Sequence, residues 1–208
     1  MRQIQNIIRL FFLLLFILLS FLVKPILWFM LFAVSLLLAL FFGRIYCGYV
    51  CPMNTVMAYS EGLAAKHRHK DKQLPKIFNS PLLPYFFILL TLILILVFKR
   101  LLMLNFPVML IWIIASIIFV FIYEPKHFHN SICPFGALQK LFGRFALYSK
   151  RIDPNKCTNC MLCMNACKKE AIKNVESGHL KISESLCHQC QECSIKCPAN
   201  AIKYTKKF

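Results

Sequence analysis

The chain has 208 residues, of which 59% are hydrophobic and 16% charged, and its mean hydropathy is +0.62. This composition lies outside the usual range of soluble globular domains and indicates a membrane protein. Lys and Arg outnumber Asp and Glu by 25 to 8, but the basic residues gather near the ends of apolar segments without any nucleic-acid-binding motif, so no nucleic-acid partner is expected.

Four apolar segments follow one another in the first part of the chain, and each is long enough to cross the core of a bilayer as a helix. They comprise residues 7–23, 26–42, 82–98 and 101–123. Arg2 and Arg9 before the first segment also suit a secretory signal, but a second apolar segment follows at once, so we expect the first helix to be retained. The sequence therefore predicts four transmembrane helices in two hairpins.

The basic residues lie mainly on one side of this predicted membrane. With four spans, the N-terminus, the 43–80 loop and everything after Tyr123 share one side, while Lys24, Lys99 and Arg100 fall on the other. The positive-inside rule makes the more basic side cytoplasmic. We therefore expect a multi-pass protein of a bacterial or archaeal cytoplasmic membrane, with both termini cytoplasmic and with basic residues in contact with anionic lipid.

Each predicted hairpin ends in a Cys-Pro pair, Cys51-Pro52 in the first and Cys133-Pro134 in the second. An amphipathic stretch follows each pair and is expected to form a helix along the membrane interface. Cys47 precedes Cys51 by one helical turn, and His129 stands where the matching cysteine of the second hairpin would be. If the hairpins pack as repeats, Cys47, Cys51, Cys133 and His129 converge as a metal or redox site. The alternative, in which these cysteines only pack at helix ends, stays open.

Eight further cysteines repeat one spacing, C-x2-C-x2-C-x3-C. The two copies begin thirty residues apart, at Cys157 and Cys187, and Pro198 follows the second copy. This spacing is typical of bacterial two-cluster ferredoxins, in which the fourth cysteine of each copy binds the cluster of the other copy. The predicted ligands are Cys157, Cys160, Cys163 and Cys197 for cluster 1, and Cys187, Cys190, Cys193 and Cys167 for cluster 2.

Two alternatives to 4Fe-4S clusters were weighed for these eight cysteines. Zinc also binds C-x2-C pairs, but two zinc sites do not explain a third and a fourth cysteine in each copy. Disulfides are disfavoured in the cytoplasm, where this part of the chain is expected to lie. His67, His69, His127, His179 and His188 are expected to be ordinary solvated side chains rather than ligands.

The predicted fold class is a membrane α-helical part followed by a small α+β two-cluster ferredoxin-like domain. The first part, residues 1–149, contains the four transmembrane helices in two pseudo-repeated hairpins, the interfacial helices and the C-x3-C-P motif. The second part, residues 150–208, holds both 4Fe-4S clusters.

The motifs resemble those of a known family. The stretch from Gly43 to Pro52, together with Ser131-Ile132-Cys133-Pro134 and the two-cluster motif, is similar to the membrane ferredoxins of the NapH and NosR type. The resemblance implies transmembrane helices, C-x3-C-P motifs and electron transfer between a quinol or cytosolic donor and a respiratory reductase. A related group, similar to the CcoG assembly factors, reduces copper. His129 departs from the pattern, because it replaces the first cysteine of the second motif.

Three functions follow from this reading. The leading hypothesis is an electron-transfer subunit without catalytic residues of its own. Its expected partners are a flavodoxin, a ferredoxin or a reductase subunit, with quinone as a further candidate. The alternative is a copper or metal reductase, or a metalloenzyme assembly factor, that uses an additional metal at the C-x3-C-P site. The third is a redox or iron sensor that signals by losing a cluster.

Overall fold

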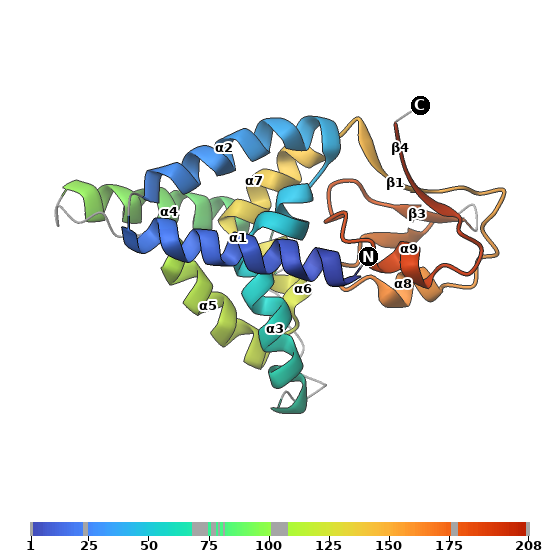
Figure 1. The fold of residues 1–208 in the computed structure, drawn as a ribbon, viewed down its shortest axis with the longest axis horizontal. Helices are drawn as coiled ribbons and strands as arrows, with labels where there is room; N and C mark the ends of the chain where they lie inside the picture. Colours follow the sequence, from blue (N-terminus) through green and yellow to red (C-terminus); the bar gives the residue numbers. More distant parts are fainter. Residues whose placement is uncertain are drawn as a thin grey trace. The chain divides into compact units, whose positions relative to one another are not determined.

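The computed structural model describes residues 2–22, 25–67, 75, 78, 80, 82–100, 108–175 and 179–206. Contacts divide the chain into two compact units. Unit 1 comprises Met1–Ala33 and Tyr49–Leu138, and unit 2 comprises Val34–Gly48 and Gln139–Phe208. Figure 1 shows helices in the blue to yellow part of the chain and short paired strands in the orange to red part. The boundary predicted at residues 149/150 stays a prediction.

The apolar segments form helices. They are α1 (Arg2–Leu22), α2 (Pro25–Phe42), α4 (Leu83–Arg100) and α5 (Val108–Ile122). Two stretches, Gln3–Phe21 and Leu83–Arg100, are long and apolar enough to cross a membrane, whereas α2 and α5 are shorter apolar helices. Lys24 and residues 101–107, the start of the fourth predicted span, lie outside the described residues. The described helices therefore provide two candidate membrane spans.

The two candidate spans expose large apolar side chains. Side chains that are more than half exposed include Phe11, Leu14 and Phe21 of α1 and Phe86, Leu89 and Leu96 of α4. A monomeric soluble protein rarely exposes a continuous apolar surface of this kind. Contact with lipid tails accounts for it, because lipid is as apolar as the side chains themselves.

In unit 1, α3 (Pro52–His67) packs against both α5 and α1. Polar groups within the apolar helices are paired: the indole Nε1 of Trp112 donates to Thr91 Oγ1 at 3.1 Å, and this hydroxyl donates to the Phe87 carbonyl at 2.7 Å. Such pairing is needed where water is absent, since an unsatisfied polar group in hydrocarbon is costly. These bonds fix α4 against α5.

The two Cys-Pro motifs occur in the same local structure. A π-helical turn, η1 (Tyr46–Val50), leads to Cys51 and to Pro52 at the start of α3. In the second copy, α6 (Pro125–His127) and the π-helical turn η3 (Phe128–Ile132) lead to Cys133 and to α7 (Pro134–Gly143). Proline suits a first helical position, because the N–H there has no partner within the helix. Single π-turns often occur at functional sites.

The last part of unit 2 is a small α+β structure. Strand β1 (Tyr148–Ile152) pairs antiparallel with β4 (Ile202–Lys206), and β2 (Ile172–Asn174) pairs antiparallel with β3 (Leu180–Ile182). Two short helices, α8 (Leu162–Ala166) and α9 (Glu192–Lys196), pack against each other. The core between these elements contains Cys163, Ala171, Ile172, Leu180, Ile182, Cys187, Cys193 and Ile202.

The two cysteine motifs have the same backbone conformation. Non-glycine residues with positive φ occur at three places in the first copy and at the same three places, thirty residues later, in the second. The pairs are Asn159 and Gln189, Met161 and Gln191, and Glu170 and Asn200. Such conformations are uncommon outside glycine. Their exact repetition indicates that the motif requires them, and left-handed turns of this kind direct successive N–H groups toward a bound anionic centre.

Candidate iron–sulfur sites

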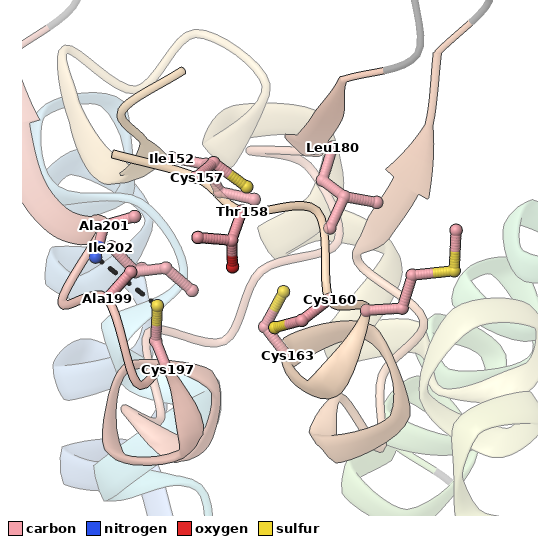
Figure 2. A pocket seen from close by; sticks show the side chains of 11 residues that line it. Ile152, Cys157, Thr158, Cys160, Cys163, Leu180, Cys197, Ala199, Ala201 and Ile202 are labelled. Atoms are coloured by element: carbon pink, nitrogen blue, oxygen red, sulfur yellow. Dashed lines mark hydrogen bonds between the residues drawn. The ribbon is translucent and has the colours of Figure 1, made fainter. Parts of the chain in front are cut away.

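Four cysteines from both copies of the motif surround one cavity. Figure 2 shows Cys157, Cys160, Cys163 and Cys197 around it, and the cavity is partly open to solvent. The remaining walls are mainly apolar and come from Ile152, Leu180, Ala199, Ala201 and Ile202. These four cysteines are the set predicted for cluster 1, and the cavity brings the fourth ligand in from the other copy.

The thiols around this cavity influence one another. Burial raises the pKa of the Cys163 thiol, and the neighbouring sulfurs of Cys157 and Cys197 raise it further. Cys160 differs, because it is fully exposed and the backbone N–H of Leu162 lowers its pKa. Cys197 of the second copy thus acts on a thiol of the first copy.

The other four cysteines form a second group. Burial raises the pKa of Cys187 to about 12, and the sulfurs of Cys190, Cys193 and Cys167 contribute in the same direction. Burial also raises the pKa of Cys193 to about 11, against the opposing charge of Lys150. Cys167 belongs to the first copy of the motif but acts on thiols of the second. The two groups are therefore crossed.

The fourth cysteine of each copy accepts the same backbone hydrogen bond. The N–H of Ala171 donates to Cys167 Sγ at 3.3 Å, and that of Ala201 donates to Cys197 Sγ at 3.4 Å. The second bond is the dashed line in Figure 2. Hydrogen bonds of this kind stabilise thiolate ligands and shift the reduction potential of a bound cluster.

The donor sets fit iron–sulfur clusters better than single metal ions. Among the described residues, no three His, Cys, Asp or Glu side chains form a group that would hold one metal ion. Four thiols spaced around a cavity suit a cluster, because each thiolate binds a different iron atom. Burial keeps these thiols protonated, so a bound cluster would have to displace their protons and offset the cost of the buried thiolates.

The residues of the predicted membrane site are all buried. Cys47 lies in unit 2, whereas Cys51, Cys133 and His129 lie in unit 1, and their convergence stays a prediction. Within unit 1, Cys133 Sγ lies 3.7 Å from the sulfur of Met53 and accepts the N–H of Gly136 at 3.2 Å. Met53 was not among the predicted ligands. Its position directly after Cys51-Pro52 was the feature of the sequence that could have indicated it.

Three other residues near the sites were missed or wrongly placed. The prediction of a solvated His188 is wrong, because this side chain is 1% exposed. His188 lies between Cys187 and Cys190 in a loop that packs against Gly48. Arg44 and Lys150 were treated only as basic residues, and both are buried in unit 2. Gly43 and Gly48, which flank Arg44 in the sequence, were the features that could have indicated its burial. His69 lies outside the described residues.

Comparison with known proteins identifies iron–sulfur domains in both parts of the chain. A family described as "4Fe-4S binding domain" matches residues 25–71 and 105–154, and one described as "4Fe-4S dicluster domain" matches residues 156–202. The first match covers both Cys-Pro motifs, and the second covers all eight cysteines of the repeated motif. No solved structure matches significantly.

Individual relatives support the same assignment. An uncharacterized protein of Methanocaldococcus jannaschii is 27% identical over 83% of this chain and 68% of its own length. The regulatory protein NosR of Stutzerimonas stutzeri is 27% identical over 76% of this chain, which spans 25% of that protein. The pyruvate synthase subunit PorD of M. jannaschii is 32% identical over 33% of this chain and 80% of its own length. The motifs, both 4Fe-4S domain matches and the similarity to NosR together support a NosR/NapH-type ferredoxin family for this chain.

Proposed function

We propose that the chain is a membrane-anchored carrier that holds two 4Fe-4S clusters and passes single electrons between a cytosolic or quinol donor and a partner reductase. The observation that carries the proposal is the crossed arrangement of thiols, in which Cys197 lines the cavity of the first three cysteines. Two sets of four thiols in one small α+β structure suit two clusters close enough for electrons to pass between them.

The bound clusters would supply the one-electron chemistry, and the residues of the chain would tune and protect it. Ile152, Leu180 and Ile202 provide apolar walls of the cavity predicted for cluster 1. The N–H groups of Ala171 and Ala201 stabilise the thiolates of the two crossing cysteines. None of the described side chains around the cavity is arranged to transform a substrate, and carriage of electrons therefore accounts best for the site.

Membrane anchoring by four spans is part of the proposal. Helices α1 and α4 have the required length, and α2 and α5 are apolar helices of 18 and 15 residues. In the sequence, the apolar segment that contains α5 begins at Leu101. The positive-inside rule then places both termini in the cytoplasm, where a flavodoxin, ferredoxin or reductase subunit has access to the clusters. A quinone in the bilayer is the alternative donor.

Metal analysis of the full chain tests the proposal. Protein purified anaerobically should contain about eight iron atoms and about eight sulfides, and dithionite should produce the EPR signals of reduced 4Fe-4S clusters. Mixed with a soluble one-electron donor and an acceptor reductase, it should accelerate electron transfer without catalysing a reaction alone. Stoichiometric zinc without sulfide would overturn the proposal.

A second function, copper binding by a reductase or assembly factor, is favoured by one observation. Cys133 and Met53 place a thiol and a thioether sulfur 3.7 Å apart, with both side chains buried. Soft sulfur ligands of this kind select Cu(I). This pair of sulfur ligands lies beside the second Cys-Pro motif.

Copper titration with matched methionine variants tests this alternative. Met53→Leu should weaken Cu(I) binding at least tenfold, because it removes the thioether and keeps the volume. Met57→Leu is the control, since Met57 is equally buried one turn further along α3. Equal Cu(I) affinity in the wild-type chain, Met53→Leu and Cys51→Ala would eliminate a copper function at this motif.

A further inference from the structure

The turn that follows α2 fits closely against the loop that carries Cys187 and Cys190, and both belong to unit 2. A Cβ atom on Gly48 would lie 2.1 Å from the carbonyl oxygen of His188. Gly43 has φ of +72°, and a Cβ there would lie 2.8 Å from Gln189 Nε2. Both glycines are therefore required for the backbone of this turn to approach the loop.

Arg44 lies between these glycines and is completely buried. Its Nη1 donates to the Ser185 carbonyl at 3.0 Å, and its Nη2 donates to Cys47 Sγ at 3.7 Å. Its aliphatic part packs on Gly143, where an added Cβ would lie 2.9 Å from Arg44 Cγ. Arginine stays charged in proteins, and burial of a guanidinium group is costly unless its charge is used.

Lys150 provides a second buried positive charge in unit 2, close to the helix that carries Cys193. It is 6% exposed, and its Nζ donates to Ser194 Oγ at 2.9 Å, directly beside Cys193 in the sequence. Lys150 of β1 thus binds the residue next to Cys193, and Arg44 of the turn after α2 binds the carbonyl of Ser185, two residues before Cys187.

The site predicted for cluster 1 has a different environment. Its lining among the described residues consists of cysteines, Thr158, Met161 and aliphatic side chains, without a charged group. The two copies of the motif have the same backbone conformation but differ in charge. Two clusters in identical surroundings would have similar reduction potentials. The difference in nearby charge would therefore separate the two potentials.

We propose that Arg44 and Lys150 are positioning residues that stabilise the reduced state of cluster 2, and that this cluster is the one linked to the Cys47 motif. The inference rests on the proposed function, because it assumes that both clusters are present. Reduction adds one electron from a one-electron donor, without a proton, to a cluster whose thiolate ligands already make it negative. Burial alone opposes this added charge, and the two buried cations offset that penalty.

The contact between Arg44 and Cys47 indicates which of the two clusters lies nearer to the Cys47 motif. The same guanidinium group touches the sulfur of the C-x3-C motif and the loop of cluster 2. Cluster 1, by contrast, includes the fully exposed thiol of Cys160 and a partly open cavity. A soluble redox partner therefore meets cluster 1, and cluster 2 faces the helix end that carries Cys47.

Redox titration of the full chain, followed by EPR in nanodiscs, tests the inference. In Arg44→Met and in Lys150→Met, the ratio of reduced to oxidised cluster 2 at a fixed potential should fall about tenfold, which is a shift of about 59 mV for one electron. The reduction potential of cluster 1 should be unchanged. Cys160→Ser alters a ligand of cluster 1 and thereby identifies which of the two steps belongs to it.

Two further variants separate charge from structure. Arg44→Lys keeps the positive charge and should restore most of the shift seen in Arg44→Met, which a purely structural role would not produce. Arg144→Met removes an exposed charge of the same unit and should leave both steps unchanged, because solvent screens it. If Arg44→Met does not retain iron, the reduction potentials of Arg44→Lys and Lys150→Met test the inference instead.

The failure of this inference is distinguishable from failure of the proposed function. If the wild-type chain holds both clusters and neither Arg44→Met nor Lys150→Met changes a reduction potential, the inference is wrong and the carrier function is unaffected. Equal shifts of both clusters overturn it as well. Wild-type chain that lacks iron and sulfide overturns the proposed function itself.

Discussion

The thiols of Cys197 and Cys163 line one cavity, although the two cysteines come from different copies of the motif. Both line the cavity in Figure 2, and the sulfur of Cys197 raises the pKa of Cys163. The corresponding pair in the other copy is Cys167 and Cys193. If these cysteines bind clusters as predicted, each copy depends on the other for its fourth ligand, and the two clusters would stabilise one folded structure together.

Double substitution distinguishes crossed from uncrossed ligand sets. Cys160→Ser combined with Cys197→Ser should disturb one cluster only and leave about half of the iron, because both residues serve cluster 1. Cys160→Ser combined with Cys167→Ser should disturb both clusters and remove most of the iron. Iron and sulfide analysis after anaerobic purification measures the difference. The reverse result would show that each copy holds its own cluster.

Gly48→Ala should destabilise unit 2 strongly. The added methyl group would lie 2.1 Å from the His188 carbonyl oxygen, so the turn and the loop must separate, and we expect a loss of about 3 kcal/mol. Loss of visible cluster absorbance during heating reports this change. Gly62→Ala is the matched control, since no atom lies within 4 Å of its added Cβ. Within α3 it should stabilise by about 0.5 kcal/mol. Equal melting of both variants would contradict the close fit.

Much of the local structure and chemistry could be predicted from the sequence. Apolar runs of the right length form α1, α2, α4 and α5, because helix is the conformation that satisfies the backbone of such segments. The spacing that begins at Cys157 and Cys187 specifies the ligand type directly, and the predicted family is confirmed. These features depend on residues that are near one another in the sequence.

The features that were missed depend on long-range packing. Arg44 and Ser185 are 141 residues apart, and Met53 and Cys133 are 80 apart, so no local pattern reports either contact. His188 was placed in solvent because an isolated histidine in a polar segment usually lies there, but the turn after α2 covers its loop. Burial of polar residues is thus where reasoning from single-sequence patterns was least informative.

Reporter fusions should reveal the orientation of the helices. Alkaline phosphatase fused after Arg100 should be active, because this position is expected outside the cytoplasm, and the same enzyme fused after Lys206 should be inactive. Green fluorescent protein at the two positions should give the opposite result. A second phosphatase fusion after Phe42 serves as the cytoplasmic control within the helical part. Activity at all three positions would contradict four spans with cytoplasmic termini.

Lys140 should make the stability of unit 2 depend on pH. Burial lowers the pKa of Lys140 below its usual value of 10.5, and the positive charges of Arg44 and Lys173 lower it further. As pH rises through the lowered value, the folded chain releases this proton before the unfolded chain does, so the unfolded state binds more protons and stability increases with pH. The increase should lie between the folded pKa and 10.5 and should be smaller in Lys140→Met. Thermal melts between pH 8 and about 11, compared with the wild-type chain, measure it. Because the Met variant also removes the repulsion from Arg44, it should be the more stable protein at pH 8, and a less stable variant there would show that the charge of Lys140 is favourable.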